Sequence, residues 1–334
     1  MRAYAIDRYK TPLTRRDMPD PRPGPGQVLV AIAATSVNPI DFKLRDGEFK
    51  AILPMEMPLI LGGDLAGTVV ALGAGATRFK VGDEVFARPD PIGTFAELIA
   101  VAESDLALKP ASIGMTEAAS LPLVALTAWQ VLVERAGLQP GQKVLIHAGS
   151  GGVGTIAIQL AKHLGATVAA TTGTTNVDLV RDLGAGVVID YRKEDFVDRV
   201  ADYDVVLNTL GADVLEKSLS VLKPDGKLIS ISGPPDPAFA RAIGANWVVR
   251  QVLRFASAKI RRKARARGVD YSFLFMHADG AQLGEIARLV DAGAIRPVID
   301  QVFAFDDLPA ALARSESGRA RGKVVVTVDS AAAA

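Results

Sequence analysis

A glycine-rich turn is the part of this sequence whose residue types and spacing indicate a chemistry most directly. Gly149, Gly151 and Gly154 fit the pattern G-x-G-x-x-G, between the apolar run 143–147 and the amphipathic run 155–162. The first glycine permits a tight turn, the second lets a pyrophosphate approach the backbone, and the third lets helix and strand pack closely. The following helix would offer N–H groups and a partial positive charge to phosphates. Strand, turn and helix in this order favour a dinucleotide site over an ordinary glycine-rich turn.

The residues after the second predicted strand indicate which dinucleotide is bound. This strand is expected at 167–171, and its end should face the adenosine ribose, where an Asp or Glu binds the 2′-hydroxyl of NAD. The run from Thr171 to Asn176 holds hydroxyls and an amide but no acid. A carboxylate would repel the 2′-phosphate of NADP, whereas hydroxyl and amide donors can bind it. We therefore expect NADPH, although the run holds no Lys or Arg, and Arg192 comes only after the next strand.

Composition limits the class of protein. A chain of 334 residues with 49% hydrophobic and 22% charged residues is long enough for two globular domains. Its 38 Lys and Arg against 37 Asp and Glu give a net charge of +1, so no bulk field recruits nucleic acid or a membrane. The absence of cysteine rules out disulfides, thiolate metal ligands and a thiol nucleophile. Residues 1–6 are typical of a strand rather than a targeting peptide, and no apolar run could span a bilayer, so we expect a cytoplasmic protein.

The chain contains parts with two different sequence patterns. The first ~120 residues are rich in turn signals and short apolar runs, which is typical of a β-rich domain. From about Thr116 helix-like segments begin, including 123–133, and strands then alternate with helices, which indicates a parallel sheet covered on both faces. The tail, 298–328, returns to β texture and is expected to rejoin the first domain. The alternating strands are expected at 143–147, 167–171, 187–189, 204–207, 227–231 and 271–275.

Several motifs occur together, in one order, along nearly the whole chain. They are Ser36–Lys43, Gly62–Gly67, Val81–Val85, Leu126–Trp129, the glycine turn and Val188–Tyr191. With them the chain resembles the medium-chain dehydrogenase/reductase superfamily, specifically its zinc-free quinone and enone reductase branch. The resemblance implies an α/β fold with a doubly wound Rossmann sheet and a β-rich domain shaped like the GroES chaperonin. We expect the GroES-like catalytic domain at 1–122, the Rossmann NADP-binding domain at 123–278, and a return to the catalytic domain at 279–334.

The residue types at the matched metal positions argue against zinc. Zinc-dependent relatives ligate the catalytic metal with a Cys, a His and a second Cys, and the resemblance places Asn38, Gly63 and about Leu123 there. Glycine and leucine cannot ligate zinc, and an amide is a poor ligand. The Cys-rich lobe that holds structural zinc in those relatives is also missing. We therefore expect no metal. His147, His163 and His277 do not have the spacing of metal ligands, and we expect His147 and His163 to be structural.

Without a metal, hydrogen bonds must polarise the substrate. Hydride addition to a conjugated quinone or enone leaves a delocalised enolate that a few donors can stabilise. The resemblance places Asn38 and Lys43 beside the nicotinamide. Quinone reductases often carry Tyr where Lys43 stands, and the lysine is similar to plant-type enone and alkenal reductases; Phe49 replaces a second Tyr. We hypothesise that Lys43 donates to the carbonyl or to the cofactor phosphate–ribose, while water protonates the α-carbon. The alternative is an ordinary surface lysine.

The resemblance also assigns cofactor contacts. Thr127 matches a threonine near the nicotinamide and is a predicted catalytic residue. The alternative is that its hydroxyl simply bonds the backbone of its helix. Tyr191 matches a tyrosine at the adenosine phosphate, and Phe275 is expected either near the nicotinamide or in the core. Ligands of open α/β sheets bind at the carboxyl ends of strands, here 208–211 and 231–233. The predicted contacts are Lys43, Thr127, Ser150, Gly151, Gly152, Val153, Thr172, Gly173, Thr174, Asn176, Tyr191, Asn208, Leu210, Gly211, Ile231, Ser232, Phe275 and Lys323.

One segment, 241–269, is an insertion relative to the smallest members of the branch. It carries apolar residues at helical spacing, Trp247, Val248, Val252 and Phe255, and then a basic run. A nucleic-acid or anionic-membrane patch is one interpretation, and a solvated helix face that packs over the substrate site or a partner subunit is the other. We favour the solvated face, because the net charge is +1 and the run has no interleaved aromatic residues. The run is Lys259, Arg261, Arg262, Lys263, Arg265 and Arg267.

These residues predict an NADPH-dependent, zinc-independent reductase that transfers hydride to a quinone or an α,β-unsaturated carbonyl. The expected partners are a small-molecule acceptor and a second copy in a homodimer, with no nucleic acid and no membrane. Two alternatives stay open, because a fold does not fix a function: a non-catalytic NADPH-binding redox sensor or scaffold, and a zinc-type alcohol dehydrogenase, which the ligand types disfavour. The sequence does not name the physiological acceptor.

Overall fold

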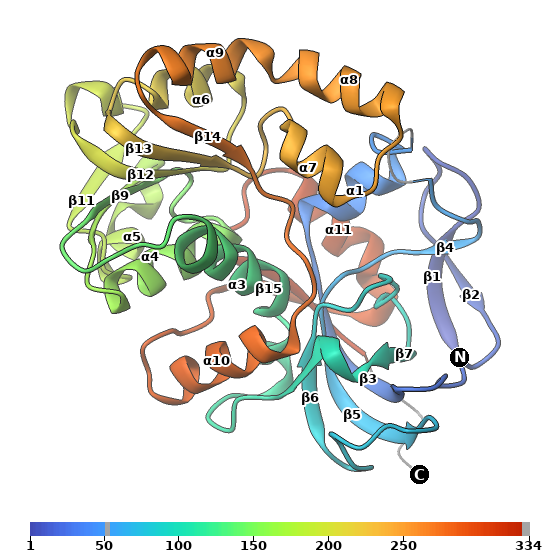
Figure 1. The fold of residues 1–334 in the computed structure, drawn as a ribbon. Coiled ribbons are helices and arrows are strands. Elements are labelled where there is room, and N and C mark those ends of the chain that lie inside the picture. The colour runs from blue at the N-terminus through green and yellow to red at the C-terminus, as the bar shows by residue number, and fades with distance from the viewer. Residues whose placement is uncertain (51–53, 329–334) are drawn as a thin grey trace. The chain divides into compact units, whose positions relative to one another are not determined.

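A computed structural model of the chain describes residues 1–50 and 54–328. The chain separates into two compact units, one formed by 1–126 with 277–334 and the other by 127–276 (Figure 1). We call these unit 1 and unit 2. Each unit has its own sheet and its own cluster of buried hydrophobic residues.

The sheet of unit 2 is parallel throughout and has the order β11-β10-β9-β12-β13-β14. Its strands are β9 (Lys143–Ile146), β10 (Thr167–Thr172), β11 (Val187–Asp190), β12 (Tyr203–Asn208), β13 (Leu222–Ser230) and β14 (Asp270–Phe273). The chain enters at β9, moves outward to β11, and then returns to β12 on the other side of β9. A reversal of this kind is the point at which doubly wound sheets bind nucleotides.

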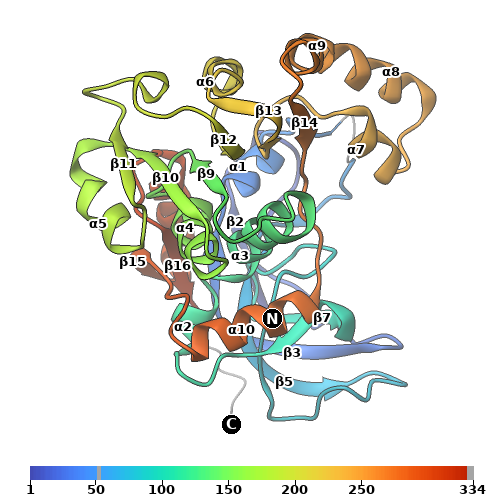
Figure 2. The same ribbon diagram turned by 60° about the vertical axis from the view of Figure 1, so that its left-hand side comes forward.

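Helices cover both faces of this sheet, as its buried, nearly continuous apolar strands require. They are α4 (Gly152–His163), α5 (Val177–Asp182), α6 (Ala212–Ser218), α7 (Pro237–Ala242), α8 (Trp247–Ala256) and α9 (Ala258–Ala266). Figure 2 shows α4 and α5 on one face and α6 and α9 on the other. The segment 241–269, expected to be helical, forms the end of α7 and all of α8 and α9 between β13 and β14.

Unit 1 is built around a seven-stranded sheet with the order β15-β16-β3-β5-β6-β8, in which β7 also pairs with β3. A smaller sheet has the order β2-β1-β4. With the parallel sheet of unit 2, this β-rich unit confirms the predicted fold class. The strands are β1 (Arg2–Ile6), β2 (Thr14–Asp17), β3 (Gln27–Val37), β4 (Leu59–Ile60), β5 (Leu65–Leu72), β6 (Glu84–Ala87), β7 (Leu98–Ala102), β8 (Leu106–Leu108), β15 (Ile299–Ala304) and β16 (Lys323–Thr327).

Strand β3 joins the early part of unit 1 to its late part. It pairs antiparallel with β5 and β7, which are close in sequence, and also with β16 near the end of the chain. Segment 277–328 therefore completes the sheet that segment 1–126 begins. The helices in and around this unit are α1 (Pro39–Arg45), α2 (Met115–Ala118), α3 (Pro122–Trp129, continued by a π-helical turn, Gln130–Arg135), α10 (Gly280–Asp291) and α11 (Leu308–Glu316).

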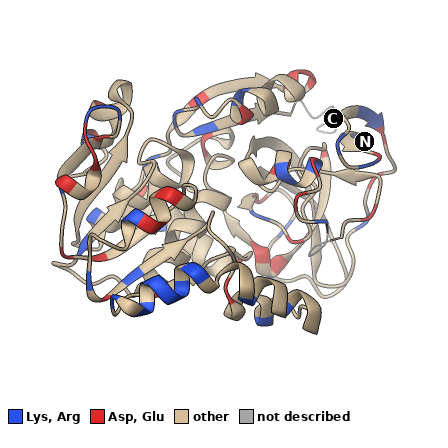
Figure 3. Cartoon of the chain, turned by 90° about the horizontal axis from the view of Figure 1, so that it is seen from above, with Lys and Arg blue, Asp and Glu red and all other residues tan. Residues whose placement is uncertain are grey.

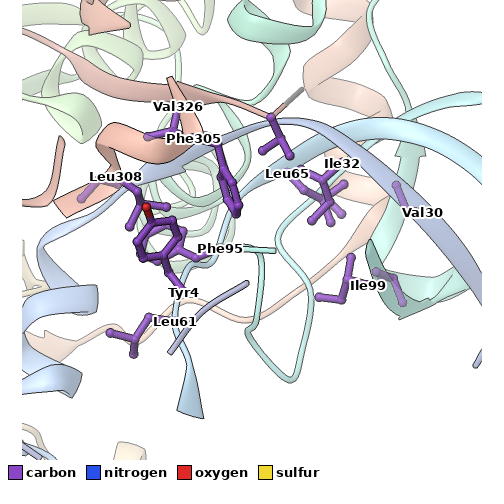
Figure 4. Close-up of a cluster of buried hydrophobic side chains, with 14 of the residues drawn as sticks. Tyr4, Val30, Ile32, Leu61, Leu65, Phe95, Ile99, Phe305, Leu308 and Val326 are labelled. Atoms are coloured by element: carbon purple, nitrogen blue, oxygen red, sulfur yellow. The ribbon is translucent and has the colours of Figure 1, made fainter. Parts of the chain in front are cut away.

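The hydrophobic core of unit 1 draws on both of its segments. Val28, Val30 and Ile32, alternate residues of β3, are fully buried, as expected for a strand with one face on a core. Figure 4 shows Tyr4 close to Phe305, and their rings meet edge to face with centroids 5.3 Å apart. An edge-to-face pair contributes about 0.5–1.5 kcal/mol beyond the burial of its area. This contact fixes β1 to the turn that precedes α11.

Two expectations about secondary structure were incomplete. The tail 298–328 contains not only strands but also α11, whose Leu- and Ala-rich sequence favours a helix. The last strand of unit 2 was expected at 271–275 but ends at Phe273, because the ladder with β13 ends at the pair Ser230–Phe273 and Phe275 has no strand partner there. No helix in the described part of the chain is long and apolar enough to cross a bilayer.

His147 ties three elements of unit 2 together. It directly follows β9, it is fully buried, and its ring bonds Thr171 of β10 (Nδ1 to Oγ1, 3.1 Å) and Ser218 of α6 (Nε2 to Oγ, 2.9 Å). Because the Ser218 hydroxyl donates to the carbonyl of Val214, its oxygen accepts from His147 and Thr171 donates to the ring. Burial lowers the pKa of His147 from 6.5 to about 4. The neutral ring is therefore part of the folded state of unit 2.

Acid should destabilise unit 2 through His147. On unfolding, His147 binds a proton below about pH 6.5, whereas in the folded chain it binds one only below about pH 4. The contribution of neutral His147 is therefore fully present above pH 6.5, and the free energy of unfolding falls by up to about 3 kcal/mol between pH 6.5 and pH 4. Both tryptophans, Trp129 and Trp247, lie in unit 2, and denaturant unfolding followed by their fluorescence measures the effect. The His147→Gln variant should lose this component of the pH dependence, whereas exposed His163→Gln should keep it. Equal pH slopes for wild type and His147→Gln would contradict the assignment.

Candidate dinucleotide site and buried polar cluster

The glycine turn after β9 leaves no room for side chains at two of its three motif positions. A Cβ placed on Gly154 would stand 2.3 Å from the carbonyl oxygen of Ala148, and one placed on Gly149 would stand 2.9 Å from the Cβ of Ala170. Both glycines thus allow α4 to pack on the strands, the role expected of the third glycine. Gly151 is the N-cap of α4 and has no side chain to accept from the first-turn N–H groups. These N–H groups can bind a phosphate instead.

Hydroxyl and amide side chains gather beside this turn, at the carboxyl end of β10. The Ser150 hydroxyl oxygen accepts from Thr172 Oγ1 (3.0 Å) and from Asn176 Nδ2 (3.1 Å). The structure thereby brings together three of the predicted cofactor residues. The Oδ1 atom of Asn176 is buried and has no hydrogen-bond partner within residues 1–50 and 54–328. A buried acceptor without a partner is rare in folded proteins, and a bound ligand is one way to satisfy it.

Two residues after β11 reach the same place. A Cβ on Gly173, which lies between Thr172 and the exposed Thr174, would stand 3.4 Å from the Tyr191 hydroxyl and 3.6 Å from Nε of Arg192. Tyr191 is 61% exposed, and the Arg192 guanidinium makes no ion pair in the described part of the chain. The cation that the sequence run 171–176 lacks is therefore supplied by the next strand end.

An acid also lies near this strand end, and sequence reasoning did not consider it. Asp190, the last residue of β11, is the register partner of Thr172. Its Oδ1 accepts from the backbone N–H of Arg192 at 3.1 Å, and its Oδ2 lies 3.4 Å from Nζ of Lys193. The carboxylate is thus bonded within its own turn, and it holds the backbone that carries Arg192.

The carboxyl ends of β12 and β13 form a second polar group. Asn208 is buried, and its Nδ2 donates to the carbonyl of Leu210 (2.9 Å) and to Ser230 Oγ (3.1 Å), while its Oδ1 has no partner among the described residues. Ser232 Oγ donates to the carbonyl of Thr209 at 3.0 Å. Of the other predicted contacts, Gly211 is exposed, Leu210 and Ile231 are half-buried, and Phe275 is 37% exposed; Gly152 and Val153 begin α4, and Thr127 is buried in α3.

The residues of unit 2 therefore fit a dinucleotide cofactor. The helix N-terminus and glycine turn suit a pyrophosphate, and two buried amide oxygens without a hydrogen-bond partner among the described residues, Asn176 Oδ1 and Asn208 Oδ1, lie near the carboxyl ends of strands, where ligands of such sheets bind. The Arg192 guanidinium and the hydroxyls near Gly173 suit a further phosphate. The Oδ2 atom of Asp190 is also buried and has no hydrogen bond among the described residues, although it lies 3.4 Å from the Lys193 ammonium.

In unit 1, the carboxylate of Asp64 is the centre of a buried polar cluster. Its Oδ2 accepts from Ser36 Oγ (2.6 Å), Asn38 Nδ2 (2.7 Å) and Lys323 Nζ (3.2 Å), and its Oδ1 accepts from the backbone N–H of Leu123 (2.6 Å). Asp64, Ser36 and Asn38 are fully buried and Lys323 is 5% exposed. The Lys323 ammonium also donates to Asn38 Oδ1 and to the carbonyl of Val37. A buried carboxylate is thus compensated by an ammonium and by three other donors.

The backbone geometry before Lys323 depends on glycine. Gly322 has φ +75°, and a Cβ there would stand 2.1 Å from the carbonyl oxygen of Val298. Any other residue would push β16 away from this carbonyl, and with it the ammonium of Lys323. The sequence pair Gly322–Lys323 therefore has a structural reason in unit 1. The prediction that Lys323 contacts the cofactor stays a prediction.

The three positions matched to zinc ligands come together in this cluster, but their chemistry does not fit zinc. Asn38 and the Leu123 backbone share Asp64, and a Cβ on Gly63 would stand 3.7 Å from Leu123 Cδ1. None of them offers a thiolate or an imidazole, and an ammonium occupies the polar centre. Within residues 1–50 and 54–328 no group of three His, Cys, Asp or Glu side chains could hold a metal.

Asp41 is a second buried acid beside the cluster, which sequence reasoning did not single out. Its Oδ2 accepts from the backbone N–H of Asn38 at 2.7 Å and so closes the first turn of α1. Burial raises the pKa of Asp41 from 3.8 to about 7. Asp41 is therefore largely protonated below neutral pH, which limits the negative charge around the single ammonium of Lys323.

Lys43 follows Asp41 on α1 but lies outside this network. It is half-buried, and its ammonium makes no hydrogen bond or ion pair in the described part of the chain. Asn38, in contrast, is bonded through both polar atoms of its amide, although Nδ2 carries a second N–H. Of the two residues predicted to polarise a carbonyl, Lys43 is thus the one whose donor group has no partner within residues 1–50 and 54–328.

Two protein families match the sequence. Residues 24–111 match the alcohol dehydrogenase GroES-like domain, and residues 183–326 match the zinc-binding dehydrogenase domain. The chain is similar to NAD(P)H oxidoreductase RTN4IP1, mitochondrial, of Danio rerio, with 36% identity over 327 residues, 91% of this chain and 84% of the relative. It is also similar to 2-methylene-furan-3-one reductase of Solanum lycopersicum, with 37% identity over 312 residues, 90% of this chain and 71% of the relative.

Solved structures agree with this assignment. The quinone oxidoreductase from Coxiella burnetii has a TM-score of 0.83 and 30% identity, and the match covers 98% of this chain and 99% of that one. The Escherichia coli quinone oxidoreductase complexed with NADPH has a TM-score of 0.82 and 25% identity, with coverage of 98% and 100%. NAD(P)H oxidoreductases and reductases of quinones or enones are thus among the relatives of this chain.

The buried ion pair makes a stability prediction. The Lys323→Met variant would leave Asp64 buried without its ammonium, and we expect it to lower the free energy of unfolding by about 3–5 kcal/mol. Denaturant unfolding measures the loss, and hydrogen exchange of β3 and β16 locates it. The Lys323→Met/Asp64→Asn double variant should recover part of the loss, since the uncompensated charge is gone. Arg288→Met, which breaks the exposed pair with Glu285, should change stability by less than about 1 kcal/mol; a loss this small for Lys323→Met would contradict the prediction.

Proposed function

The chain belongs to the medium-chain dehydrogenase/reductase superfamily, and from that premise we propose that it is an NADPH-dependent reductase of quinones or α,β-unsaturated carbonyls. The observation that carries the proposal is the carboxyl edge of the unit 2 sheet, where a glycine turn, an N-cap without a side chain and two orphaned buried acceptors meet. The relatives give the reaction class, because they include NAD(P)H oxidoreductases and an enone-type reductase.

The preference for NADPH rests on the residues around Gly173. The Arg192 guanidinium and the Tyr191 hydroxyl flank this glycine, and Thr172 and Asn176 are bonded through Ser150. A guanidinium binds a phosphate through charge-assisted hydrogen bonds. The Asp190 carboxylate nearby is bonded to the Arg192 N–H and paired with Lys193, which offsets part of its negative charge.

The reaction requires the protein to align two carbons and to stabilise one developing charge. The reduced nicotinamide, when bound, supplies the hydride. Lys43 donates a charged hydrogen bond to the acceptor carbonyl or to the cofactor phosphate–ribose, and the second N–H of Asn38 and the hydroxyl of Thr127 are further candidate donors. Hydride reaches the β-carbon, the enolate oxygen takes up negative charge, and water then protonates the α-carbon. A conjugated acceptor suits this site, because the negative charge of its enolate is delocalised. This charge needs fewer hydrogen-bond donors than the charge that develops when a simple ketone is reduced.

The decisive experiment compares acceptors and cofactors side by side. Oxidation of NADPH and of NADH is measured at steady state with small quinones, acyclic enones and saturated ketones. We expect turnover with quinones or enones, a preference for NADPH, and little turnover of saturated ketones. Turnover of ketones but not of enones would overturn the mechanism. Binding of NADPH without turnover of any acceptor would favour the non-catalytic sensor or scaffold.

A variant at Arg192 tests the cofactor preference. Arg192→Gln removes the cation beside Gly173 but leaves the hydrogen bond from its backbone N–H to Asp190. We expect the Kd for NADPH to rise about tenfold to hundredfold, since a hydrogen bond to a charged group contributes about 1.5–3 kcal/mol, while the Kd for NADH changes less than about threefold. Fluorescence titration of both cofactors measures the split. The neighbouring Lys193→Gln serves as the control, and an equal loss for both cofactors in Arg192→Gln would rule out a role in phosphate recognition.

A variant at Lys43 tests the proposed donor. Lys43→Met removes the ammonium while keeping a long apolar side chain, and we expect kcat/KM for an enone or quinone to fall about 100-fold, as for the loss of one transition-state donor. The matched control is Lys80→Met at an exposed site of unit 1, which should be silent. Lys43→Arg should retain part of the rate, since it keeps the charge. Unchanged turnover together with unchanged cofactor affinity in Lys43→Met would refute the assignment.

A further inference from the structure

One face of helix α8 is apolar and exposed. Val248, Val252 and Phe255 are spaced four and three residues apart and therefore share a helix face, and Trp247 lies at its edge. Their exposed fractions are 60%, 59% and 76%, and that of Trp247 is 73%. Single exposed apolar residues are ordinary, but a contiguous row with two aromatic rings marks an interaction surface. We call these four residues the α8 face.

The α8 face is directed outward because the opposite side of the helix is anchored. Leu253, on that side, is buried, and α8 packs on α7 and α9. Asn246 starts the helix: its Oδ1 accepts from the backbone N–H of Val249 at 3.0 Å. At the other end, Ser257 is fully buried and its hydroxyl donates to the carbonyl of Leu253. The helix is thus fixed in this rotation, with its largest apolar side chains in solvent.

The charge around the α8 face has one sign. The segment 237–269 contains nine Lys and Arg residues and no Asp or Glu. Since the whole chain has 38 Lys and Arg against 37 Asp and Glu, the residues outside this segment carry 29 cations against the same 37 acids. Figure 3 shows Lys and Arg gathered along α9, which follows α8 directly. The net charge of +1 therefore conceals a strong separation of charge.

Part of this positive charge is available to a partner. Lys259 and Lys263 both pair with Glu216 of α6. Arg262 and Arg265 are exposed and make no ion pair in the described part of the chain. Arg254, on α8 itself, lies two turns after Trp247 at the edge of the α8 face and also makes none there. An exposed apolar row bordered by unpaired guanidinium groups is complementary to a surface that is apolar inside and anionic outside.

We propose that α8 and α9 dock unit 2 onto the surface of a lipid bilayer that contains anionic headgroups. Helices that lie in the plane of a bilayer interface combine Trp, Phe and other apolar residues on one face with Lys and Arg beside them. The α8 face enters the boundary between headgroups and acyl chains, and the arginines of α8 and α9 bind the phosphates. Several cations near an anionic bilayer, together with the apolar face, give reversible binding.

The same observations disfavour two other occupants. A two-fold contact with a second copy would place the α8 face on itself and bring Arg254 against the same arginine of that copy, which like charges oppose. A nucleic acid would use the cations, and its bases could stack on Trp247 or Phe255, but it would leave the valines without a partner. A bilayer satisfies the charges, the aromatic rings and the valines at once.

This proposal revises the expectation of a solvated helix face for 241–269. That expectation used the net charge of the whole chain and the absence of aromatic residues within the basic run, and it did not consider the apolar residues of α8 together with the cations. The structure instead shows the apolar residues exposed beside the cations. The proposal does not depend on the proposed reductase activity, because it concerns a surface of unit 2 whose residues are not among the predicted cofactor contacts.

The test uses the full chain and vesicles of defined composition. Flotation at 150 mM salt with vesicles of phosphatidylcholine alone, and of phosphatidylcholine with about one-third phosphatidylserine, should show binding to the anionic vesicles only. Raising the salt to 500 mM should weaken this binding, since screening shortens the reach of the charges. Binding should also shift the emission of Trp247 to shorter wavelength. The Trp247→Phe variant should bind but lose this shift, which separates contact by α8 from contact elsewhere.

Paired variants separate the two parts of the surface. Val252→Ser/Phe255→Ser and Arg262→Glu/Arg265→Glu should each weaken partitioning onto anionic vesicles by about tenfold or more. The matched controls are Val81→Ser and Arg8→Glu/Arg22→Glu, which change exposed residues of the same kinds in unit 1. All variants should keep the melting temperature and the NADPH affinity of the wild type, because the changed side chains are exposed and lie outside the core.

Three outcomes would overturn the proposal. The first is no binding to anionic vesicles at 150 mM salt. The second is binding that the unit 1 controls weaken as much as the α8 and α9 variants do. The third is a different occupant: a dimer that Val252→Ser/Phe255→Ser dissociates, or a single-stranded oligonucleotide that binds at 150 mM salt, in either case without vesicle binding. Since activity enters none of these readouts, a failure here leaves the proposed reductase function untouched.

Discussion

A buried carboxylate needs hydrogen-bond donors to compensate its charge. In unit 1 the donors to Asp64 fix the positions of the elements around it. Its donors come from the end of β3, from the start of α1, from α3 and from β16. No two of these segments could move apart without leaving a charge or a donor unsatisfied in a dry interior. The residues in the metal-ligand positions of related enzymes are held by the same network, so in this chain an internal ion pair does the structural part of what a metal centre does elsewhere.

Unit 2 is organised by a different constraint, the close packing of the glycine turn against α4 and β10. At Gly149 and Gly154 there is no space for even a methyl group, and the turn that results presents N–H groups rather than side chains. Specificity must then come from the rim, where Ser150, Thr172 and Arg192 converge from three separate strand ends. The two units thus contribute different features. Unit 1 has a fixed polar interior with the half-buried Lys43 beside it, and unit 2 has a sheet edge whose residues fit a nucleotide.

The parts of the fold that sequence could predict are those that depend on neighbours along the chain. The glycine turn, the alternating strands and the helical spacing of Trp247 to Phe255 are local patterns, and all were found. The pairing of Lys323 with Asp64 was not predicted, because no local pattern connects residues 259 positions apart. Arg192 was noted only for its place after a strand, because its approach to Gly173 depends on the pairing of β10 with β11. Asp41 was noted only as part of a motif, because its raised pKa depends on burial. Periodicity likewise identified α8 as amphipathic but could not say whether its apolar face would be covered.

The pairing of β3 with β16 has a consequence for the order in which the chain is made. Synthesis delivers unit 2 whole, as one uninterrupted stretch, whereas unit 1 is delivered in two parts that flank it. At about 5–20 residues per second, the ribosome takes on the order of tens of seconds to travel from Asp64 to Lys323. Throughout that interval the nascent chain holds a carboxylate without its ammonium and an unfilled place beside β3, whereas unit 2 has all of its strands once Phe273 has been added, before β16 is made. Unit 2 is therefore expected to fold before unit 1. Segment 1–126 is expected to stay incompletely folded until β16 has been made.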